Sequence, residues 1–379
     1  MKDWIGMDIA ILGYGTVGRG VADIVEHKTE GIRVTRILEL PDRLTDPRMT
    51  SNFDDIVDDP SIELVVECMG GIEPARTFIS RALSAGKHVA TSNKAVVAAS
   101  FPELAALSSA HGASLYIEAS VGGGVPWIAG IAKARRIDRI ASFMGIMNGT
   151  TNYIIDAMST RGIEFAEALR DAQEKGYAER DSSADIDGID VANKTVITAS
   201  VSFGCACTRS LPVTGIRNLT KGDLEFFAER ERTVKLIGRG TALDGAYAVA
   251  VEPVALASSS LEAHVPANNN LVTLVGDTVG ELKFYGQGAG MMPTGNAVVQ
   301  DILDCASGLR RTYDFSSERT FEPALLASDY VLRTTSAPMQ GEALGEHRRL
   351  LHGMTAVEAR ALYERVLESD PSAFIVALA

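Results

Sequence analysis

The sequence has few cysteines, few histidines and few aromatic residues, and it has no long apolar run. Its 379 residues include 4 Cys and 6 His, and aromatic residues make up 6% of the chain. The cysteines show no disulfide spacing, which is typical of reduced thiols in the cytosol. No segment reaches the roughly 18 consecutive apolar residues of a membrane-spanning helix, and Asp3 and Asp8 interrupt the N-terminal segment where a signal peptide would be apolar. We therefore expect a cytoplasmic protein with no disulfide framework and no membrane anchor.

Positive charge is also scarce. Lys and Arg number 36 against 49 Asp and Glu, which gives a net charge of −13. Such a surface repels nucleic acids and anionic membranes, so we expect neither as a partner.

Cys205 and Cys207 fall in an apparently helical run, where residues two apart point to different faces, so we expect no metal site there. With 46% hydrophobic residues, the composition indicates a folded protein of two or three domains.

Residues 1–115 alternate short apolar runs with helical patterns, which predicts a doubly wound parallel α/β sheet. The expected strands are 8–12, 32–40, 64–68 and 87–91, and the expected helices are 16–27 and one that begins near Pro74. From residue 116 the pattern changes, and we expect a second, α+β domain over 116–285. Residues from about 286 to 325, with a helix over 294–306, would complete the first domain. A short extension over 326–379 is expected to hold a strand (330–333), a helix (355–367) and a strand (374–378).

The loop after the first expected strand reads G-x-G-x-x-G and leads into the first expected helix. Its glycines permit a tight turn and a close approach to a pyrophosphate, which the helix N-terminus attracts. The candidate cofactor contacts are Gly13, Gly15, Thr16, Val17 and Gly18. Glu39 ends the second strand about 20 residues later, where an acid contacts the adenosine ribose. The alternatives are a purely structural turn and a solvated carboxylate. The pattern favours a Rossmann-type site for NAD or NADP.

Four further segments occur in a fixed order. They are 66–71, 86–94, 118–126 and 145–154, the last continued by 176–181 and 185–194. Together they resemble the homoserine dehydrogenase family. The resemblance implies an NAD(P)-dependent oxidoreductase that interconverts L-homoserine and L-aspartate 4-semialdehyde in threonine, methionine and isoleucine biosynthesis. It also implies a homodimer or a higher homo-oligomer, formed through the substrate-binding second domain.

Asp190 and Lys194 stand four residues apart and share a helix face, with the acid on the favoured side. By itself this pattern would be a surface ion pair. The resemblance instead implies that Lys194 is the general acid and base and that Asp190 helps to hold it. It further implies that Glu179 binds the substrate's amino group and that Asp185 lies near its hydroxyl group.

The resemblance assigns further contacts. Lys94 would be a second catalytic lysine, near substrate and cofactor; the alternative is a lysine that caps a turn between strand and helix. The remaining residues are Ser92 and Gly288 for the cofactor and Asn148, Gly149 and Thr150 for the substrate.

The family also binds a monovalent cation, sodium or potassium. The matching positions here are Glu118, Val121, Gly123 and Val125. The alternative is a glycine-rich turn without an ion, because backbone carbonyl ligands leave no side-chain pattern.

Two other functions remain open at this stage. One is a Rossmann dehydrogenase for another amino or hydroxy acid, since a fold does not set the substrate. The other is a catalytically silent cofactor-binding sensor. For a member of this family we expect NAD to be favoured over NADP, because Glu39 would repel the 2′-phosphate of NADP. Arg43 would partly offset that repulsion. We expect weak or absent threonine inhibition, because the extension is too short for a full regulatory ACT domain.

Overall fold

The computed structural model describes residues 6–336 and 340–379. The chain forms two compact units, which we describe separately. The first comprises the described residues up to Lys133, together with Ser200–Ala206 and Gln287–Ser317. The second comprises Ala134–Ala199, Cys207–Gly286 and the described residues from Glu318 to Ala379. Across the described ranges, no helix combines the length and the apolar character needed to cross a membrane.

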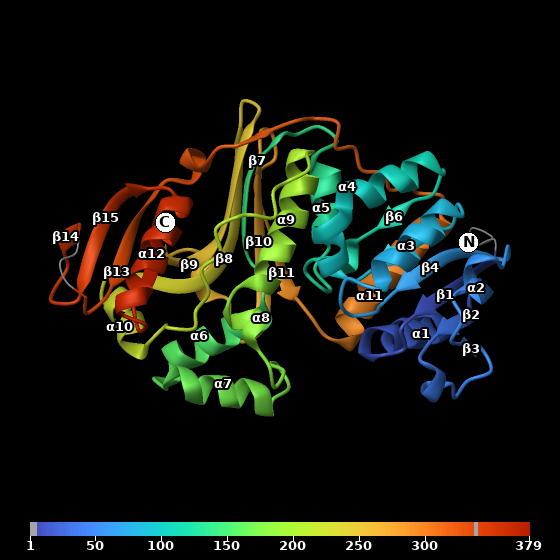
Figure 1. The fold of residues 1–379 in the computed structure, drawn as a ribbon, viewed down its shortest axis with the longest axis horizontal. Helices are drawn as coiled ribbons and strands as arrows, with labels where there is room; N and C mark the ends of the chain where they lie inside the picture. Colours follow the sequence, from blue (N-terminus) through green and yellow to red (C-terminus); the bar gives the residue numbers. More distant parts are fainter. Residues whose placement is uncertain (1–5, 337–339) are drawn as a thin grey trace. The chain divides into compact units, whose positions relative to one another are not determined.

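The first unit is built on a six-stranded sheet (Figure 1). Its strands are β1 (Met7–Leu12), β2 (Ile32–Leu38), β3 (Met49–Thr50), β4 (Ile62–Glu67), β5 (His88–Thr91) and β6 (Leu115–Tyr116). They lie in the order β3-β2-β1-β4-β5-β6 with parallel pairing throughout. This arrangement confirms the predicted doubly wound sheet. Because all strands run the same way, their carboxyl ends meet at one edge, where such folds place ligands.

Helices cover the faces of this sheet. They are α1 (Thr16–Lys28), α2 (Asp54–Val57), α3 (Ala75–Ser84), α4 (Lys94–Ala110), α5 (Trp127–Ala134) and α11 (Met291–Ala306), with short 3₁₀ turns η1 (Pro41–Arg43) and η2 (Glu118–Ser120). Helices α1 and α11 lie side by side (Figure 1) and share one apolar core with β1 and β4. They approach so closely that a Cβ on Gly20 would lie only 2.6 Å from the Met291 carbonyl oxygen, so this position requires glycine. The late segment 291–306 therefore completes the first unit.

The second unit is built on a ten-stranded mixed sheet. Its strands are β7 (Ile140–Ile146), β8 (Arg232–Leu243), β9 (Ala246–Ala257), β10 (Asn269–Gly276), β11 (Gly280–Gln287), β12 (Thr320–Phe321), β13 (Ser328–Arg333), β14 (Glu342–Ala343), β15 (Arg348–Met354) and β16 (Phe374–Leu378). The order is β11-β10-β7-β8-β9-β16-β13-β15-β14, with β12 beside β9. The helices are α6 (Gly149–Arg161), α7 (Phe165–Glu174), α8 (Ser183–Ile186), α9 (Ile189–Phe203), α10 (Lys221–Ala228) and α12 (Ala356–Ser369), with 3₁₀ turns η3 (Glu262–His264) and η4 (Pro323–Leu326).

The C-terminal segment contains more strands than the sequence predicted. The strand, helix and strand expected there are present as β13, α12 and β16, but β14 and β15 were missed. The sequence of β15 has no clear alternation, and antiparallel pairing with β13 supports it, with Tyr330 opposite Leu351. Asp223 of α10 accepts hydrogen bonds from Arg333 of β13 (2.8 Å) and Arg348 of β15 (3.2 Å). Within the described residues the segment still has a single α-helix.

The prediction that Cys205 and Cys207 lie in a helix was wrong. Helix α9 ends at Phe203, and Gly204 follows with a φ of 66°, the left-handed conformation that commonly ends a helix. The argument from helix faces therefore does not apply to the two thiols, which are unoxidised. In the described part of the chain, no three His, Cys, Asp or Glu side chains are grouped to hold a metal ion.

Candidate functional site

The glycine-rich loop lies between β1 and α1, at the carboxyl edge of the parallel sheet. Gly13 has a φ of 88°, in the region that favours glycine. A Cβ on Gly18 would lie 2.1 Å from the Gly13 carbonyl oxygen, whereas a Cβ on Gly15 would meet no heavy atom within 4 Å. No side chain caps α1 at Gly15, so the first N–H groups of the helix can receive an anion. The loop therefore fits a pyrophosphate.

Glu39 lies beside this loop, just after β2. Its Oε2 accepts the Tyr14 N–H and its Oε1 accepts the Leu40 N–H, both at 3.0 Å. The side chain is 13% exposed, and an Arg43 guanidinium nitrogen stands 4.0 Å from Oε1. A cavity of about 420 Å³ is formed here; its lining includes Gly13, Gly15, Glu39, Arg43, Met69 and Phe78. Glu39 therefore holds the loop in shape, besides standing where a ribose contact is expected.

Glu67 is a buried residue at the end of β4, and no role was predicted for it from the sequence. It accepts hydrogen bonds from Thr91 Oγ1 (2.5 Å), the Met69 N–H (2.7 Å) and Asn93 Nδ2 (3.3 Å). Burial raises its pKa to about 7, against the opposing effect of these hydrogen bonds. An acid directly after the apolar run 64–66 was the available signal for such a role. Glu67 ties the ends of β4 and β5 together.

The segment that carries Ser92 and Lys94 is held by the same network. Asn93 caps α4 through a bond from the Val96 N–H (3.3 Å), and its amide also donates to the Gly71 carbonyl (2.7 Å). The Ser92 N–H donates to the carbonyl of Glu67. Lys94 is the first residue of α4 and is half-buried. Lys94 belongs to the first unit, whereas Lys194 belongs to the second.

The candidate cation loop lies at η2 and the turn that follows it. Both Glu118 carboxylate oxygens accept N–H groups at the start of α5, from Ile128 at 3.0 Å and from Ala129 at 2.7 Å. Gly123 has a φ of 55°, and a Cβ there would lie 2.5 Å from the carbonyl carbon of Gly288. The structure therefore brings Gly288 against this loop. Since the carboxylate is committed to α5, a cation here would depend on backbone carbonyls.

Lys194 and Asp190 form a buried pair on α9, in the second unit. Lys194 Nζ donates to Asp190 Oδ2 at 2.8 Å and to the Met147 carbonyl oxygen at 2.7 Å, at the end of β7. Each side chain is 9% exposed. The surface ion pair that the spacing alone would suggest is therefore excluded. An ammonium has three N–H donors, so one donor remains for a further acceptor.

Asn148 joins the two acids of this site. Its Nδ2 donates to Asp185 Oδ1 at 2.7 Å and to Asp190 Oδ2 at 2.9 Å, while its Oδ1 caps α6 by accepting the Thr151 N–H at 2.8 Å. The cap determines which way the amide faces. Burial raises the pKa of Asp185, and the nearby Asp190 charge raises it further. The resemblance implied a substrate contact for Asn148, but nothing in the sequence indicated this bridge.

Thr150 and Glu179 complete the predicted substrate residues. The Thr150 hydroxyl donates to the Tyr177 carbonyl at 2.5 Å, and the rings of Tyr153 and Tyr177 lie 5.0 Å apart. These contacts anchor the segment before Glu179 to α6. Glu179 itself is exposed, which suits a residue that meets a ligand. The structure thus groups Asn148, Thr150, Asp185, Asp190 and Lys194 around the start of α6, with Glu179 on an anchored segment.

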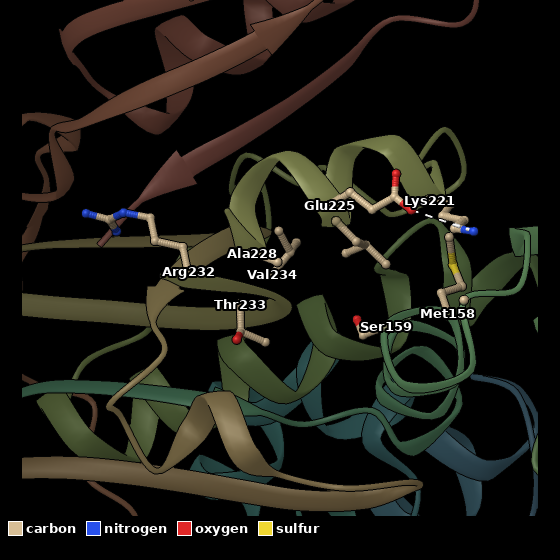
Figure 2. Close-up of a pocket in the computed structure, with 10 residues that line it drawn as sticks. Met158, Ser159, Lys221, Glu225, Ala228, Arg232, Thr233 and Val234 are labelled. Atoms are coloured by element: carbon tan, nitrogen blue, oxygen red, sulfur yellow. Dashed lines mark ion pairs between the residues drawn. The ribbon is translucent and has the colours of Figure 1, made fainter. Parts of the chain in front are cut away.

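A separate cavity of about 150 Å³ lies in the second unit between α6, α10 and β8 (Figure 2). Lys221 and Glu225 face each other across one turn of α10, 3.6 Å apart. Arg232 points away from them (Figure 2) and donates to the carbonyls of Ala255 and Ala379. None of the candidate site residues lines this cavity, so it is distinct from the site.

Comparison with known proteins identifies the family. A family model described as homoserine dehydrogenase matches residues 126–303, and one described as its NAD-binding domain matches residues 13–118. The homoserine dehydrogenase of Synechocystis is 39% identical, over 78% of this chain and 72% of the relative, and that of Lactococcus lactis is 31% identical, over 96% and 89%. The crystal structure of a homoserine dehydrogenase from Thiobacillus denitrificans superposes with a TM-score of 0.88 at 29% identity, covering 98% of both chains. The chain belongs to the homoserine dehydrogenase family.

Proposed function

We propose that the chain catalyses the NAD(P)-dependent interconversion of L-homoserine and L-aspartate 4-semialdehyde. The observation that carries the proposal is the buried Lys194–Asp190 pair, bridged through Asn148 to Asp185. We assign the first unit to the dinucleotide and the second to the substrate. The nicotinamide, when bound, donates or accepts the hydride.

Lys194 serves as the general acid and base. In the reduction, C4 of the aldehyde receives the hydride and its oxygen gains negative charge, and a Nζ–H of Lys194 delivers the proton to that oxygen. In the oxidation, the neutral amine takes the proton back from the hydroxyl group. Asp190 and the Met147 carbonyl accept the other two N–H groups and so aim the third donor.

The acids around Lys194 suit a substrate with an ammonium group. Glu179 binds that ammonium, because an exposed carboxylate on an anchored segment can close on a cation. Asp185 accepts a hydrogen bond near the reacting oxygen. Lys94 and Ser92 act from the edge of the parallel sheet, next to the cofactor. The hydrogen bonds from the Asn93 amide to Glu67 and Gly71 support this assignment, because they hold the segment that carries both residues in place.

A monovalent cation, sodium or potassium, is proposed at the loop of Glu118, Val121, Gly123 and Val125. The backbone carbonyls are the ligands, and the Glu118 carboxylate shapes the loop through α5. Carbonyl oxygens suit hard cations. Thermal stability measured in sodium, potassium and tetramethylammonium chloride tests the site, since only an ion that fits the loop will stabilise it beyond the effect of ionic strength.

We further propose a homodimer or higher homo-oligomer built through the second unit, weak or absent threonine inhibition, and a place in cytoplasmic threonine, methionine and isoleucine biosynthesis. Among its described residues the segment 318–379 holds one α-helix, α12, and the regulatory proposal concerns this segment alone. Sedimentation at only 40.3 kDa would exclude the oligomer. Strong inhibition by millimolar threonine would exclude the regulatory proposal.

The deciding experiment follows reduced-nicotinamide absorbance with the purified chain. Homoserine should be oxidised with either coenzyme, and serine, threonine and lactate should be poor substrates. A better substrate among these would establish a dehydrogenase for another acid. Dinucleotide binding without turnover of any of them would establish a silent sensor. Either result would overturn the proposal.

A further inference from the structure

Three polar residues occur at intervals of four at positions 148, 152 and 156, the first as the N-cap of α6 and the others within it, so they share one face of the helix. Asn148 holds the acids of the candidate substrate site. Asn152 and Asp156 face a different structure, the segment 265–269, which leads from the end of η3 to the first residue of β10. One helix face therefore joins the substrate turn to this segment.

The segment 265–269 is tied to α6 through its backbone. The Asn152 amide nitrogen stands within hydrogen-bond distance of three carbonyl oxygens, those of Val265 (3.1 Å), Ala267 (2.8 Å) and Asn269 (3.3 Å). Asp156 Oδ2 accepts the Ala267 N–H at 2.9 Å. Ala267 has a φ of 52°, a conformation that a non-glycine residue keeps only when its surroundings impose it. The segment is thus held in a conformation that it would not adopt alone.

Lys235 of β8 sets the orientation of this amide. Its Nζ donates to Asn152 Oδ1 at 2.8 Å and to the Val265 carbonyl at 2.9 Å, and the residue is 2% exposed. An ammonium can only donate hydrogen bonds, so it selects the amide oxygen and turns the amide nitrogen toward the carbonyls. Burial lowers the pKa of Lys235 to about 8. A buried lysine bonded to an amide and a carbonyl is costly to keep, which indicates that its placement has a use.

The segment also lies directly against the substrate turn. A Cβ on Gly149 would be 2.6 Å from the Asn268 carbonyl oxygen. Gly149 comes immediately after Asn148, which holds the two acids. Any movement of the segment toward or away from α6 therefore reaches the first turn of the helix.

We propose that Lys235 is a positioning residue of the substrate site. Acting through Asn152, it holds segment 265–269 against Gly149 and thereby fixes the turn that orients Asp185 and Asp190. The inference rests on the proposed function, specifically on the assignment of Asn148, Gly149 and Thr150 to the substrate. It adds a residue that touches neither the substrate nor the acids, and it predicts an effect on homoserine alone.

The test compares full-length wild type with Lys235→Met, Asn152→Leu and the double variant. Each single change should raise KM for homoserine about tenfold and leave KM for the dinucleotide within about twofold, because displacement of positioning groups weakens productive binding. The double variant should be no worse than either single variant, because both residues act through one contact. Hydrogen exchange of the backbone in 265–269 should accelerate in all three.

The matched control is Lys87→Met. Lys87 is another buried lysine, and it donates to two carbonyls, those of Asp59 (2.6 Å) and Ile62 (2.8 Å), in the first unit. It should lose stability without a change in KM for homoserine. If Lys235→Met does not fold, Lys235→Gln supplies the same measurements.

Three results would overturn the inference. They are a homoserine KM within twofold of wild type in a folded Lys235 variant, additive effects in the double variant, or an equal rise in the dinucleotide KM. An inactive wild type would instead overturn the proposed function, so the two failures are distinguishable.

Discussion

The candidate sites of the two units are built from different chemical groups, backbone in the first unit and side chains in the second. In the first unit the candidate ligand surface is mainly backbone: glycines without Cβ atoms, the open N-terminus of α1 and the carboxyl ends of parallel strands. In the second unit it is made of buried charged and polar side chains, Lys194 and Asp190 above all. A backbone site needs special residues at set spacings, and spacing is readable from sequence. A side-chain site needs partners that folding brings together, and those partners cannot be read from the sequence.

The largest effect is expected in the second unit. Lys194→Ala should lower kcat by about 10²–10⁴-fold, because a general acid–base group is lost. Dinucleotide affinity, measured by fluorescence titration, should be unchanged, since the dinucleotide loop belongs to the first unit. Lys221→Ala, which removes a half-buried lysine of the same unit outside the candidate site, is the control and should retain full turnover. More than about a tenth of the wild-type kcat in Lys194→Ala would contradict the assignment.

In the first unit, the buried carboxyl group of Glu67 should make the free energy of unfolding depend on pH. The folded-state pKa of Glu67 is raised from 4.5 to about 7, so the folded protein holds a proton that the unfolded chain releases. This contribution is fully present below pH 4.5 and is lost as the pH rises to 7. Wild type should lose about 3 kcal/mol relative to Glu67→Gln over that range.

Urea unfolding of both proteins at pH 5, 6, 7 and 8 measures this difference. Glu67→Gln lacks the titrating group but also one hydrogen-bond acceptor, so only the change with pH is diagnostic. A stability difference that stays constant over the four pH values would show that the carboxyl group titrates normally.

Glu179 tests whether the second unit recognises charge. Glu179→Ala should raise KM for homoserine about tenfold or more while changing kcat little, because a charge-assisted contact to the ammonium contributes about 1.5–3 kcal/mol. Glu174→Ala removes an exposed acid close by in the sequence and should change neither constant. Unchanged KM in Glu179→Ala would remove this residue from the substrate site.

Glu39 tests whether the first unit discriminates between coenzymes. Wild type should prefer NAD and still use NADP, and Glu39→Ala should shift the ratio of kcat/KM values about tenfold toward NADP, by loss of repulsion on the 2′-phosphate. NAD itself should also bind less well, because the bonds to the Tyr14 and Leu40 N–H groups are lost. Asp42→Ala, an exposed acid nearby, controls for surface charge. A tenfold wild-type preference for NADP would refute the role of Glu39.

The smallest effect concerns a buried amide of the second unit. Asn270 is 1% exposed, and neither its amide oxygen nor its nitrogen has a hydrogen-bond partner in the described structure. Asn270→Leu should raise the free energy of unfolding by about 1 kcal/mol, because an unpaired polar group is replaced by an apolar one of similar size. In Asn218→Leu, where the amide donates to the carbonyls of Pro371 and Ala373, stability should fall. Thermal unfolding measures both, and a loss of stability in Asn270→Leu would mean that its amide is paired.

Much of the fold could be predicted because local patterns agree with it. The alternation in the first 115 residues predicted β1, α1, β2, β4 and β5, and the glycine spacing placed the dinucleotide loop between the first strand and helix. The elements that were missed depend on distant partners. Strand β15 is supported by pairing with β13. The end of α9 is a different case, because it is set locally by the left-handed conformation of Gly204.

The sequence by itself determined where glycine was required, where an acid follows a strand, and that Asp190 and Lys194 share a helix face. Only the tertiary structure decided that this pair is buried and that Asn148 bridges Asp185 and Asp190. It alone showed that Glu67 joins two strand ends and that Lys235 holds segment 265–269. The physical reason is sequence distance: spacing and propensity act over one or two turns, whereas burial and hydrogen-bond partners come from residues tens of positions away that only folding brings within 3 Å.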